Sequence, residues 1–343
     1  MSNITLEYAT NTPCKILKNL PDDEKEQIAD LIVEHYYEVG FPYYELTKEQ
    51  KIVISGKLKN FKTDRLDIGE NEIQQNMLGL NFVNYYHPQM WSVECNNSLS
   101  PMQMFKNKSF FKRAILKRIQ YSNTKLQPYN IRKSLMVFGS QRVSNFRPTV
   151  AKYIYDKYCP PGGTVLDPCA GYGGRLFGAW ASDKVDYYVG IDPDPNQIDG
   201  NARMALDLHH VESRLTSYLR KIPFEDFKVF EKSYDLIFTS PPYFDTEKYS
   251  YDKRQSWMRY RVYDKWVEKF LEPLIKKSYS FLRSGCYFIL NVGNPITDDA
   301  VRIGNEVFGE YEDVLQMRLS RVLGSRNPNK FKLEPIYVWR KNG

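Results

Sequence analysis

The chain of 343 residues is poor in cysteine and histidine and has no long apolar run, and each shortage excludes a class of protein. Its five cysteines are odd in number and lack the paired spacing of a metal site, which argues against a disulfide framework and against zinc. No secretory signal or membrane span is predicted. The four scattered histidines favour packing or surface roles over a catalytic imidazole. We therefore expect a cytoplasmic protein with no metal.

Two common nucleotide-binding signatures are missing from the glycine-rich segment 167–174 (Asp-Pro-Cys-Ala-Gly-Tyr-Gly-Gly). The segment follows a short run typical of a buried strand, residues 164–167, and precedes a helix-like stretch, residues 175–182. Its glycines lack the six-position spacing of dinucleotide folds, and no Lys-Ser or Lys-Thr closes it as in a phosphate loop, so NAD and ATP are disfavoured. The glycines still allow positive φ and close approach of a ligand to a helix N-terminus, which predicts a nucleotide-like cofactor.

A second strand signature, residues 187–192, ends in an acid. Asp192 stands at about the 20-residue offset at which α/β nucleotide folds place a carboxylate on ribose hydroxyls. It is therefore the predicted ribose ligand. An alternative stays open, because Asp-Pro-Asp-Pro at 192–195 also reads as a turn in which Asp192 caps the next helix.

The third feature is Ser-Pro-Pro-Tyr at 240–243, directly after the apolar run 234–239. The run predicts a buried strand, so the tetrapeptide would lie at its carboxyl end. Alone, the tetrapeptide would be a polyproline turn that closes a strand. Together with the glycine loop upstream, it supports a functional interpretation.

These three features resemble those of the S-adenosylmethionine-dependent amino-methyltransferases that act on adenine N6 or cytosine N4 of DNA. The resemblance covers residues 141–343, and the tetrapeptide after a strand is its specific part. It implies that S-adenosylmethionine is the cofactor and that Asp192 binds its ribose. The loop residues implied to bind the cofactor are Asp167, Pro168, Ala170, Gly171 and Gly173.

The resemblance implies cofactor contacts at two more places. Phe146, Arg147 and Pro148 belong to a segment that, in this family, precedes the cofactor strand and contacts the methionine moiety. The same residues read equally well as a helix start with Pro148 in the first turn. Glu225 or Asp226 would contact the adenine.

The expected chemistry assigns the tetrapeptide residues separate roles. An exocyclic amine is a weak nucleophile because its lone pair is delocalised into the ring, and acceptors for both amine hydrogens favour the pyramidal, reactive geometry. Ser240 Oγ and the Pro241 carbonyl are the predicted acceptors, and Pro242 restricts the backbone that presents them. Tyr243 would stack on a base rotated out of the helix. No covalent nucleophile is required, so Cys169 is interpreted as a packing residue.

Basic residues are concentrated in one part of the chain. Residues 101–157 hold 13 Lys or Arg and one acid, a local net charge of +12 that leaves −5 for the rest. Such a block predicts binding to a phosphate backbone. Within it, the predicted nucleic-acid contacts are Lys112, Arg113, Lys117 and Arg118. A solvated helix face is the alternative interpretation.

A second mixture of basic and aromatic residues follows the tetrapeptide, at 248–263. We expect a loop over the active site that receives the flipped base. Its predicted nucleic-acid contacts are Lys253, Arg254, Trp257 and Arg259. Alternatively, Trp257, Tyr260 and Tyr263 attach a long loop to the core.

The remaining pattern predicts an α/β fold, a doubly wound and mostly parallel sheet with a mainly helical N-terminal region. In the sheet domain we expect a helix over 263–282 that ends before Gly285, a strand over 286–292 and a final strand over 334–339.

Two domains are expected, residues 1–140 and 141–343. The first would contain a helix that is capped by Asp22 or Asp23 and ended by Gly40. Its predicted apolar face comprises Ile28, Leu31, Ile32, Tyr36 and Val39. Because little chain follows Trp339, this first domain is the predicted recognition region.

Together these features predict a DNA amino-methyltransferase, with cytosine N4 slightly ahead of adenine N6, and DNA as its partner. An RNA methyltransferase acting on adenine N6 or guanine N2 would share every residue named. A DNA-binding protein that keeps the cofactor fold without turnover is the alternative from another class.

Overall fold

The computed structural model describes residues 4–137, 140–228, 233–321 and 331–342 and divides the chain into two compact units. The helical unit comprises Met1–Glu45, Pro88–Ser144 and Thr246–Tyr249. The sheet unit comprises Leu46–His87, Asn145–Asp245 and Ser250–Gly343. No helix in the described ranges is long and apolar enough to cross a bilayer.

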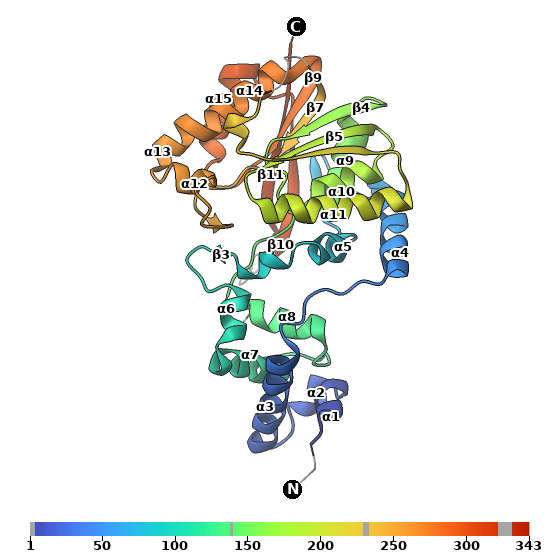
Figure 1. The fold of residues 1–343 in the computed structure, drawn as a ribbon, viewed down its shortest axis with the longest axis vertical. Coiled ribbons are helices and arrows are strands. Elements are labelled where there is room, and N and C mark those ends of the chain that lie inside the picture. Colours follow the sequence, from blue (N-terminus) through green and yellow to red (C-terminus); the bar gives the residue numbers. More distant parts are fainter. Residues whose placement is uncertain (1–3, 138–139, 229–232, 322–330, 343) are drawn as a thin grey trace. The chain divides into compact units, whose positions relative to one another are not determined.

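The sheet unit is built on a nine-stranded sheet of order β1-β2-β10-β11-β9-β7-β4-β5-β6 (Figure 1). Its strands are β1 (Asp67–Gly69), β2 (Glu72–Gln74), β4 (Gly163–Asp167), β5 (Val185–Asp192), β6 (Thr216–Lys221), β7 (Tyr234–Thr239), β9 (Leu282–Asn291), β10 (Asp313–Arg321) and β11 (Phe331–Arg340). Strands β6, β5, β4, β7 and β9 are mutually parallel, and β11 is antiparallel to β9 and β10. The predicted fold class is confirmed.

Helices cover both faces of this sheet (Figure 1). The helices of the sheet unit are α4 (Lys48–Lys59), α5 (Leu80–Tyr85), α9 (Pro148–Tyr158), α10 (Gly174–Ala181), α11 (Pro195–Val211), α12 (Ser256–Arg259), α13 (Tyr263–Trp266), α14 (Glu272–Phe281) and α15 (Thr297–Phe308). Side chains alternate along each strand, so the core has two layers. Val165 packs in a cluster with residues of α9 and α10, whereas its neighbour Leu166 packs in a cluster with residues of α14 and α15.

Strand order reverses at β4. From β4 the chain proceeds through β5 to β6 on one side, and it then returns to β7 and β9 on the other side. Open α/β sheets bind ligands outside the carboxyl ends of the strands at such a switch point. The carboxyl ends of β4, β5 and β7 are therefore where a cofactor site is expected.

Two boundaries within the sheet unit differ from the sequence prediction. The helix expected over 263–282 consists of α13, a π-helical turn (Val267–Leu271) and α14, and it ends at Phe281. Strand β9 begins directly afterwards at Leu282. Gly285 therefore lies inside β9, at φ +79°, and does not end the helix.

The predicted domain boundary near residue 140 is incomplete. The sheet unit also takes up Leu46–His87, because Phe82 of α5 stacks on Phe177 of α10 at 4.4 Å between ring centroids and β2 pairs with β10. Residues Thr246–Tyr249, which follow the tetrapeptide, belong to the helical unit instead. Hydrophobic patterning of short segments cannot reveal such long-range pairings.

The helical unit matches the expected mainly helical region. Its elements are α1 (Leu6–Asn11), α2 (Cys14–Leu17), α3 (Asp22–Val39), α6 (Pro101–Lys106), α7 (Lys108–Tyr121), α8 (Pro128–Val137) and the short ribbon β3 (Glu94–Cys95) with β8 (Glu247–Lys248). Helix α3 ends at Gly40 as predicted, but its N-cap is Pro21 and no side chain caps it, so the predicted Asp22 or Asp23 cap is wrong: both acids lie in the first turn. The helix buries Ile28, Ile32 and Tyr36, whereas Val39 is 63% exposed. Val39 is the last residue of α3.

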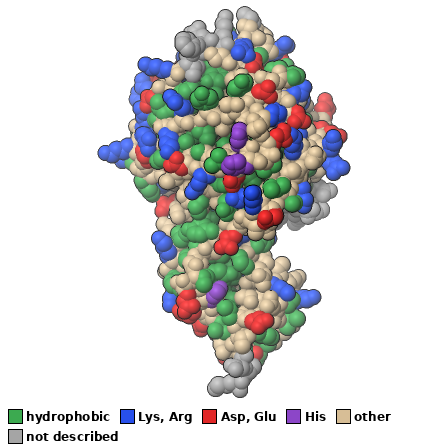
Figure 2. Space-filling view, turned by 45° about the vertical axis from the view of Figure 1, so that its right-hand side comes forward, with side chains coloured by type: hydrophobic (Ala, Val, Ile, Leu, Met, Phe, Trp, Pro, Cys, Tyr) green, Lys and Arg blue, Asp and Glu red, His purple; other side chains and the backbone are tan. Residues whose placement is uncertain are grey.

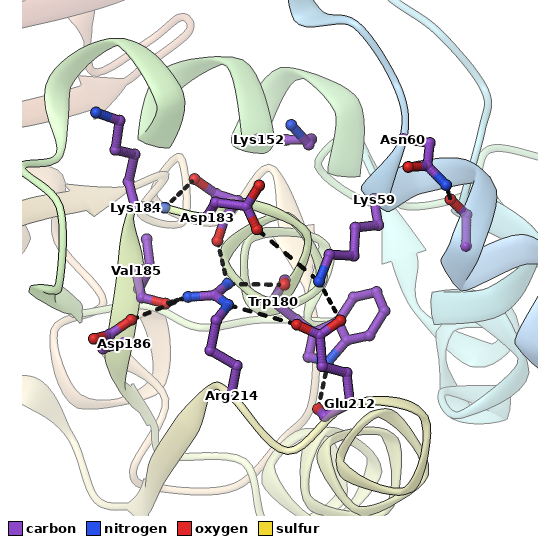
Figure 3. A network of polar contacts seen from close by, with 12 residues as sticks. Lys59, Asn60, Lys152, Trp180, Asp183, Lys184, Val185, Asp186, Glu212 and Arg214 are labelled. Carbon is purple, nitrogen blue, oxygen red and sulfur yellow. Dashed lines mark hydrogen bonds and ion pairs between the residues drawn. The ribbon is translucent and has the colours of Figure 1, made fainter.

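A polar network connects elements at the amino-terminal ends of the strands (Figure 3). The guanidinium of Arg214 donates to the carbonyl oxygens of Trp180 at 3.3 Å and of Val185 at 2.5 Å, and also to Ser182 O. It thus satisfies carbonyls at the end of α10 that lack intrahelical partners. Lys59 of α4 pairs with Glu212 in the same network. These contacts are structural, and they lie at the amino end of β5, whereas Asp192 lies at its carboxyl end.

Candidate active site

The glycine loop and the tetrapeptide are joined at the carboxyl ends of two adjacent strands. Strands β4 and β7 are parallel neighbours, with Val165 opposite Leu236. Thr239, the last residue of β7, donates its hydroxyl to Asp167 Oδ1 at 2.9 Å. Ser240 follows directly, so the first residue of the tetrapeptide and the start of the glycine loop are held together by a buried hydrogen bond.

Asp167 cannot bind a ligand through its side chain, which corrects one predicted contact. The carboxylate is fully buried and accepts from Arg175 Nε at 2.7 Å, Tyr188 Oη at 2.6 Å and the Cys169 amide at 3.3 Å, in addition to Thr239. Its acceptor sites are filled by protein donors, and Arg175 compensates its charge. Asp167 therefore secures the loop and does not contact a cofactor.

The glycine loop has the backbone conformation that the sequence predicts. Gly171 (φ +54°) and Gly173 (φ +77°) are in the left-handed region, and Gly173 is the N-cap of α10. A Cβ on Gly173 would meet Asn201 Oδ1 at 2.2 Å, and one on Gly174 would meet the Phe146 carbonyl at 2.0 Å. A Cβ on Gly171 would make only ordinary contacts, the nearest at 3.8 Å to Cys169 O, and Gly171 is half-buried. Pro168 and Ala170 are buried in the loop's base.

Asp192 ends β5 and faces this loop. Its Oδ2 accepts the Gly171 amide at 3.0 Å and its Oδ1 accepts the Asp194 amide at 2.9 Å, while only 7% of the residue is exposed. Burial raises the pKa of Asp192 to about 7, against the opposing effect of these two amides. The N-cap of α11 is Asp194, which accepts the Asn196 amide at 2.9 Å. The interpretation of Asp192 as the cap of the next helix is therefore wrong. The carboxylate oxygens of Asp192 have lone pairs beyond those that accept the two amides, and these can accept hydrogen bonds from hydroxyl groups.

Residues 145–148 lie against the glycine loop. Asn145 Nδ2 donates to Tyr172 O at 3.2 Å, and the Phe146 ring packs edge-on against Phe238. Pro148 is buried at the first position of α9, as the helix interpretation predicted. Both interpretations of this segment are compatible with the geometry, because the helix start is adjacent to the loop.

Arg147 is engaged by the protein. Its Nε donates to Gln75 Oε1 at 2.5 Å and its Nη1 donates to Asn145 O at 3.1 Å. Arg147 is half-buried, and the hydrogen bond to Gln75 orients its side chain beside the glycine loop.

Glu225 and Asp226 form a short helical turn (Phe224–Asp226) after β6, at the same edge of the sheet. Burial raises the pKa of Glu225, whose side chain is 11% exposed. Arg259 pairs with both acids, at 3.2 Å and 3.1 Å. Lys277 of α14 donates to the carbonyls of Phe224, Glu225 and Phe227 at 2.7 to 3.0 Å and so fixes the turn. Lys277 was not predicted, because backbone acceptors leave no mark in the sequence.

The tetrapeptide leaves β7 into a constrained turn. Ser240 is half-buried, and no hydrogen bond of its hydroxyl occurs within the described ranges. Pro241 is buried, and Pro242 and Tyr243 are half-buried. The next residue, Phe244, has a φ of +59°, which is uncommon for a bulky side chain and typical of functional turns.

The predicted cationic contacts of the helical unit fall into two groups. Lys112 pairs with Glu26 at 2.6 Å and with Asp30 at 2.7 Å, and Arg118 is 7% exposed and donates to Thr124 and Asn130. Arg118 is therefore a structural residue, and its assignment as a nucleic-acid contact is wrong. Arg113 and Lys117 are exposed. On the face drawn in Figure 2, Lys and Arg side chains are interspersed with Asp and Glu.

The basic residues after the tetrapeptide also differ in availability. Lys253 is exposed, whereas Arg254 binds Asp252 at 2.7 Å and Arg259 binds Glu225 and Asp226. Trp257 packs edge-on against Tyr251. Tyr260 and Tyr263 pack against the core, so for these two residues the alternative interpretation, in which aromatic side chains attach the loop to the core, is correct.

Cys169 is half-buried beside the core, and burial raises the pKa of its thiol well above the usual range. The thiolate that a covalent mechanism requires is therefore disfavoured. Within the described ranges, no cluster of three or more His, Cys, Asp or Glu side chains could hold a metal ion.

No family model matches the chain, and no curated protein matches it in sequence. Solved structures with a similar fold include a methyltransferase from Pyrococcus furiosus, 14% identical, covering 57% of this chain and 83% of that chain with a TM-score of 0.37. Others are a TehB-like SAM-dependent methyltransferase from Corynebacterium glutamicum (18% identity, 58% and 90% coverage, TM-score 0.37) and a tRNA (m1A58) methyltransferase from Aquifex aeolicus (10%, 59% and 71%, 0.39). Likenesses at this level carry no argument about activity.

Proposed function

We propose that this protein transfers a methyl group from S-adenosylmethionine to an exocyclic amine of a nucleobase in DNA, cytosine N4 or adenine N6. The observation that supports this most strongly is the hydrogen bond from Thr239 to Asp167, because it joins a cofactor-like loop to the tetrapeptide at one sheet edge. A polyproline turn with no catalytic role would not require this junction with a glycine loop.

The residues around the loop fit the proposed cofactor. The Gly171 backbone is only half-buried, the N-terminus of α10 presents amides, and Asp192 has lone pairs for ribose hydroxyls. Glu225 lies after the adjacent strand, where an adenine amine would find an acceptor. When bound, the cofactor supplies an electrophilic methyl group on a sulfonium.

The tetrapeptide would activate the amine. Ser240 Oγ and the Pro241 carbonyl accept its two hydrogens, which favours the pyramidal nitrogen, and Tyr243 provides a ring on which the base stacks. The roles require no nucleophile from the protein, which agrees with a Cys169 thiol held in its protonated form. Proximity and orientation are then the main contributions of this chain.

The decisive experiment is incubation with isotopically labelled S-adenosylmethionine and separate DNA and RNA pools, followed by mass spectrometry of the nucleosides. We expect N4-methylcytosine or N6-methyladenine in the DNA pool. Labelled RNA alone would favour the RNA alternative. DNA and cofactor binding without any labelled nucleoside would favour a non-catalytic DNA-binding protein.

Ser240→Ala tests the role of the tetrapeptide. We expect methyl transfer to fall at least about a hundredfold, because an amine acceptor is lost, while calorimetric affinity for the cofactor changes little. Ser217→Ala, in β6 and away from the tetrapeptide, is the matched control and should behave as the wild type. Full turnover by Ser240→Ala would remove the catalytic assignment.

A further inference from the structure

The carbonyl groups of two consecutive residues in the glycine loop are hydrogen-bonded by asparagine side chains. Asn201 Nδ2 donates to Gly171 O at 2.9 Å, and Asn145 Nδ2 donates to Tyr172 O at 3.2 Å. Both asparagines are buried. The Gly171 amide is bound by Asp192, so Gly171 is held through both its amide and its carbonyl. Residues outside the loop therefore fix its backbone at two successive positions.

His87 holds Asn201 in this orientation. Because Asn201 Nδ2 donates to the loop, its Oδ1 is the acceptor, and His87 Nε2, 3.0 Å away, donates to it. His87 is fully buried, and burial lowers its pKa to about 3, so the ring is neutral at physiological pH. The ring also packs edge-on against Tyr172, at 5.5 Å between centroids. His87 therefore contacts the loop both directly and through Asn201.

Glycines at two positions allow these close contacts. A Cβ on Gly200 would lie 2.4 Å from His87 Cε1. Gly200 is inside α11 and has no positive φ, so its missing side chain serves the approach of the histidine ring. A Cβ on Gly173 would lie 2.2 Å from Asn201 Oδ1. The histidine, the asparagine and the loop are packed so closely that a displacement of one must displace the next.

His87 and Asn145 lie at two of the points where the chain passes between the units. The sheet unit includes the chain up to His87, the helical unit takes Pro88–Ser144, and Asn145 is the first residue that belongs to the sheet unit again. The segment before the first crossing is also attached to α11 by Arg203, whose Nη2 donates to Tyr86 O at 3.1 Å. Both crossings are therefore linked to the glycine loop by hydrogen bonds.

We propose that His87 and Asn145 couple the glycine loop to these two crossings, so that binding of the cofactor at the loop restricts the chain where it enters and leaves segment 88–144. This inference rests on the proposed function. Asn201 is a positioning residue that acts through the Gly171 carbonyl, and His87 acts through Asn201. Because such coupling is reciprocal, DNA bound by the helical unit raises the affinity for the cofactor if it favours the same conformation of the crossings.

Hydrogen exchange of backbone amides in the cofactor-free full chain tests the coupling from both ends. Gly173→Ala places a methyl group against Asn201 and should speed exchange at His87 by about tenfold, roughly the loss of one hydrogen bond. His87→Leu should in turn speed exchange at Gly171 by a similar factor. Asn201→Ala, which adds no atom, should speed exchange at both ends. A response confined to the mutated end would overturn the proposal.

Two variants are matched controls for these exchange measurements. Gly285→Ala changes another glycine of positive φ, at which a Cβ would have no atom within 4 Å. His209→Leu changes an exposed histidine on α11. Neither control should alter exchange at His87 or Gly171, and one that speeds it as much as Gly173→Ala does would also overturn the proposal. The amides of β7 provide the reference for global unfolding, so a general loss of stability is not mistaken for coupling.

Measurements with S-adenosylhomocysteine separate this coupling from the proposed function. His87→Leu should weaken calorimetric binding about tenfold, whereas His87→Gln, whose amide nitrogen can replace Nε2 as the donor, should stay within about threefold of the wild type. In the wild type, the ligand should slow exchange at His87 and Asn145. Binding without slower exchange there overturns the coupling and leaves the proposed function intact. The expected responses of the cofactor-free variants in a protein that does not bind S-adenosylhomocysteine would support the coupling and refute the cofactor assignment.

Discussion

Replacing Asp192 by asparagine should make the cofactor-free protein more stable at neutral pH. The Asp192 residue is 7% exposed, and within the described part of the chain its carboxylate accepts hydrogen bonds from two amides, those of Gly171 and Asp194, and pairs with no cation. Ionising it inside the fold is therefore unfavourable. Asparagine has nearly the same shape and carries no charge, so it removes this cost.

The magnitude follows from the pKa. A shift from 3.8 to about 7 corresponds to about 4 kcal/mol at 1.36 kcal/mol per unit. Because the folded-state pKa is raised, the folded protein binds more protons than the unfolded chain between about pH 4 and about pH 7, and stability falls with rising pH across that window. Below it the penalty is absent, and above it the penalty is complete.

Urea unfolding of wild type and Asp192→Asn at about pH 5 and about pH 8 measures this effect. The stability of the variant relative to the wild type should increase by about 3 kcal/mol between the two conditions. A pH-independent change, such as the loss of one amide hydrogen bond, cancels in this comparison. If the difference between the two proteins is the same at both pH values, the assignment of a buried, ionisable carboxylate at the loop is refuted.

Other predictions concern the same edge and the helical unit. Calorimetry should show that the affinity of the wild type for S-adenosylhomocysteine rises as the pH increases toward about 7 and then levels off. The affinity of Asp192→Asn should not change with pH in this range. If the affinities of the two proteins change with pH in the same way, the ribose contact is refuted. Asp167→Asn leaves Arg175 buried without its counter-charge and should lower the free energy of unfolding by about 3 to 5 kcal/mol. The control Asp186→Asn, at a half-exposed ion pair, should lower it by less than about 1 kcal/mol. Gly173→Ala should destabilise more than Gly285→Ala, since both have positive φ but only the former meets a neighbouring atom; equal losses would contradict the close packing. Lys117→Ala should make the slope of the logarithm of the DNA-binding constant against the logarithm of salt concentration shallower by about one. Arg118→Ala should instead lower the free energy of unfolding, because Arg118 is buried.

Much of the fold could be predicted because its signals are local. The strands that became β4, β5 and β7 are short apolar runs followed by turn residues, and buried parallel strands have this composition. Helix α3 was bounded by acids at its start and Gly40 at its end. The inclusion of Leu46–His87 in the sheet unit could not be predicted, because ring packing such as Phe82 on Phe177 has no periodic signature.

The structure brings the glycine loop, Asp192 and the start of the tetrapeptide to one sheet edge, and the binding and catalytic roles of these residues stay predictions. Residue type suggested that Asp167 and Asp192 both bind cofactor, but burial and donor count separate them: Asp167 is saturated by protein donors, and Asp192 is not. Likewise the sequence could not reveal that Lys112, Arg118 and Arg259 have partners within the protein, because those partners lie on other segments or depend on local geometry.

By itself, the sequence determined that a glycine loop and Ser-Pro-Pro-Tyr each follow a buried strand, because strand composition and turn chemistry act over a few residues. Only the tertiary structure decided that β4 and β7 are neighbours, that Thr239 binds Asp167, and that the Tyr243 ring packs against Gly293, about fifty residues further along the chain. These facts depend on strand order and register, which are set by how all the apolar faces pack together and not by any one segment.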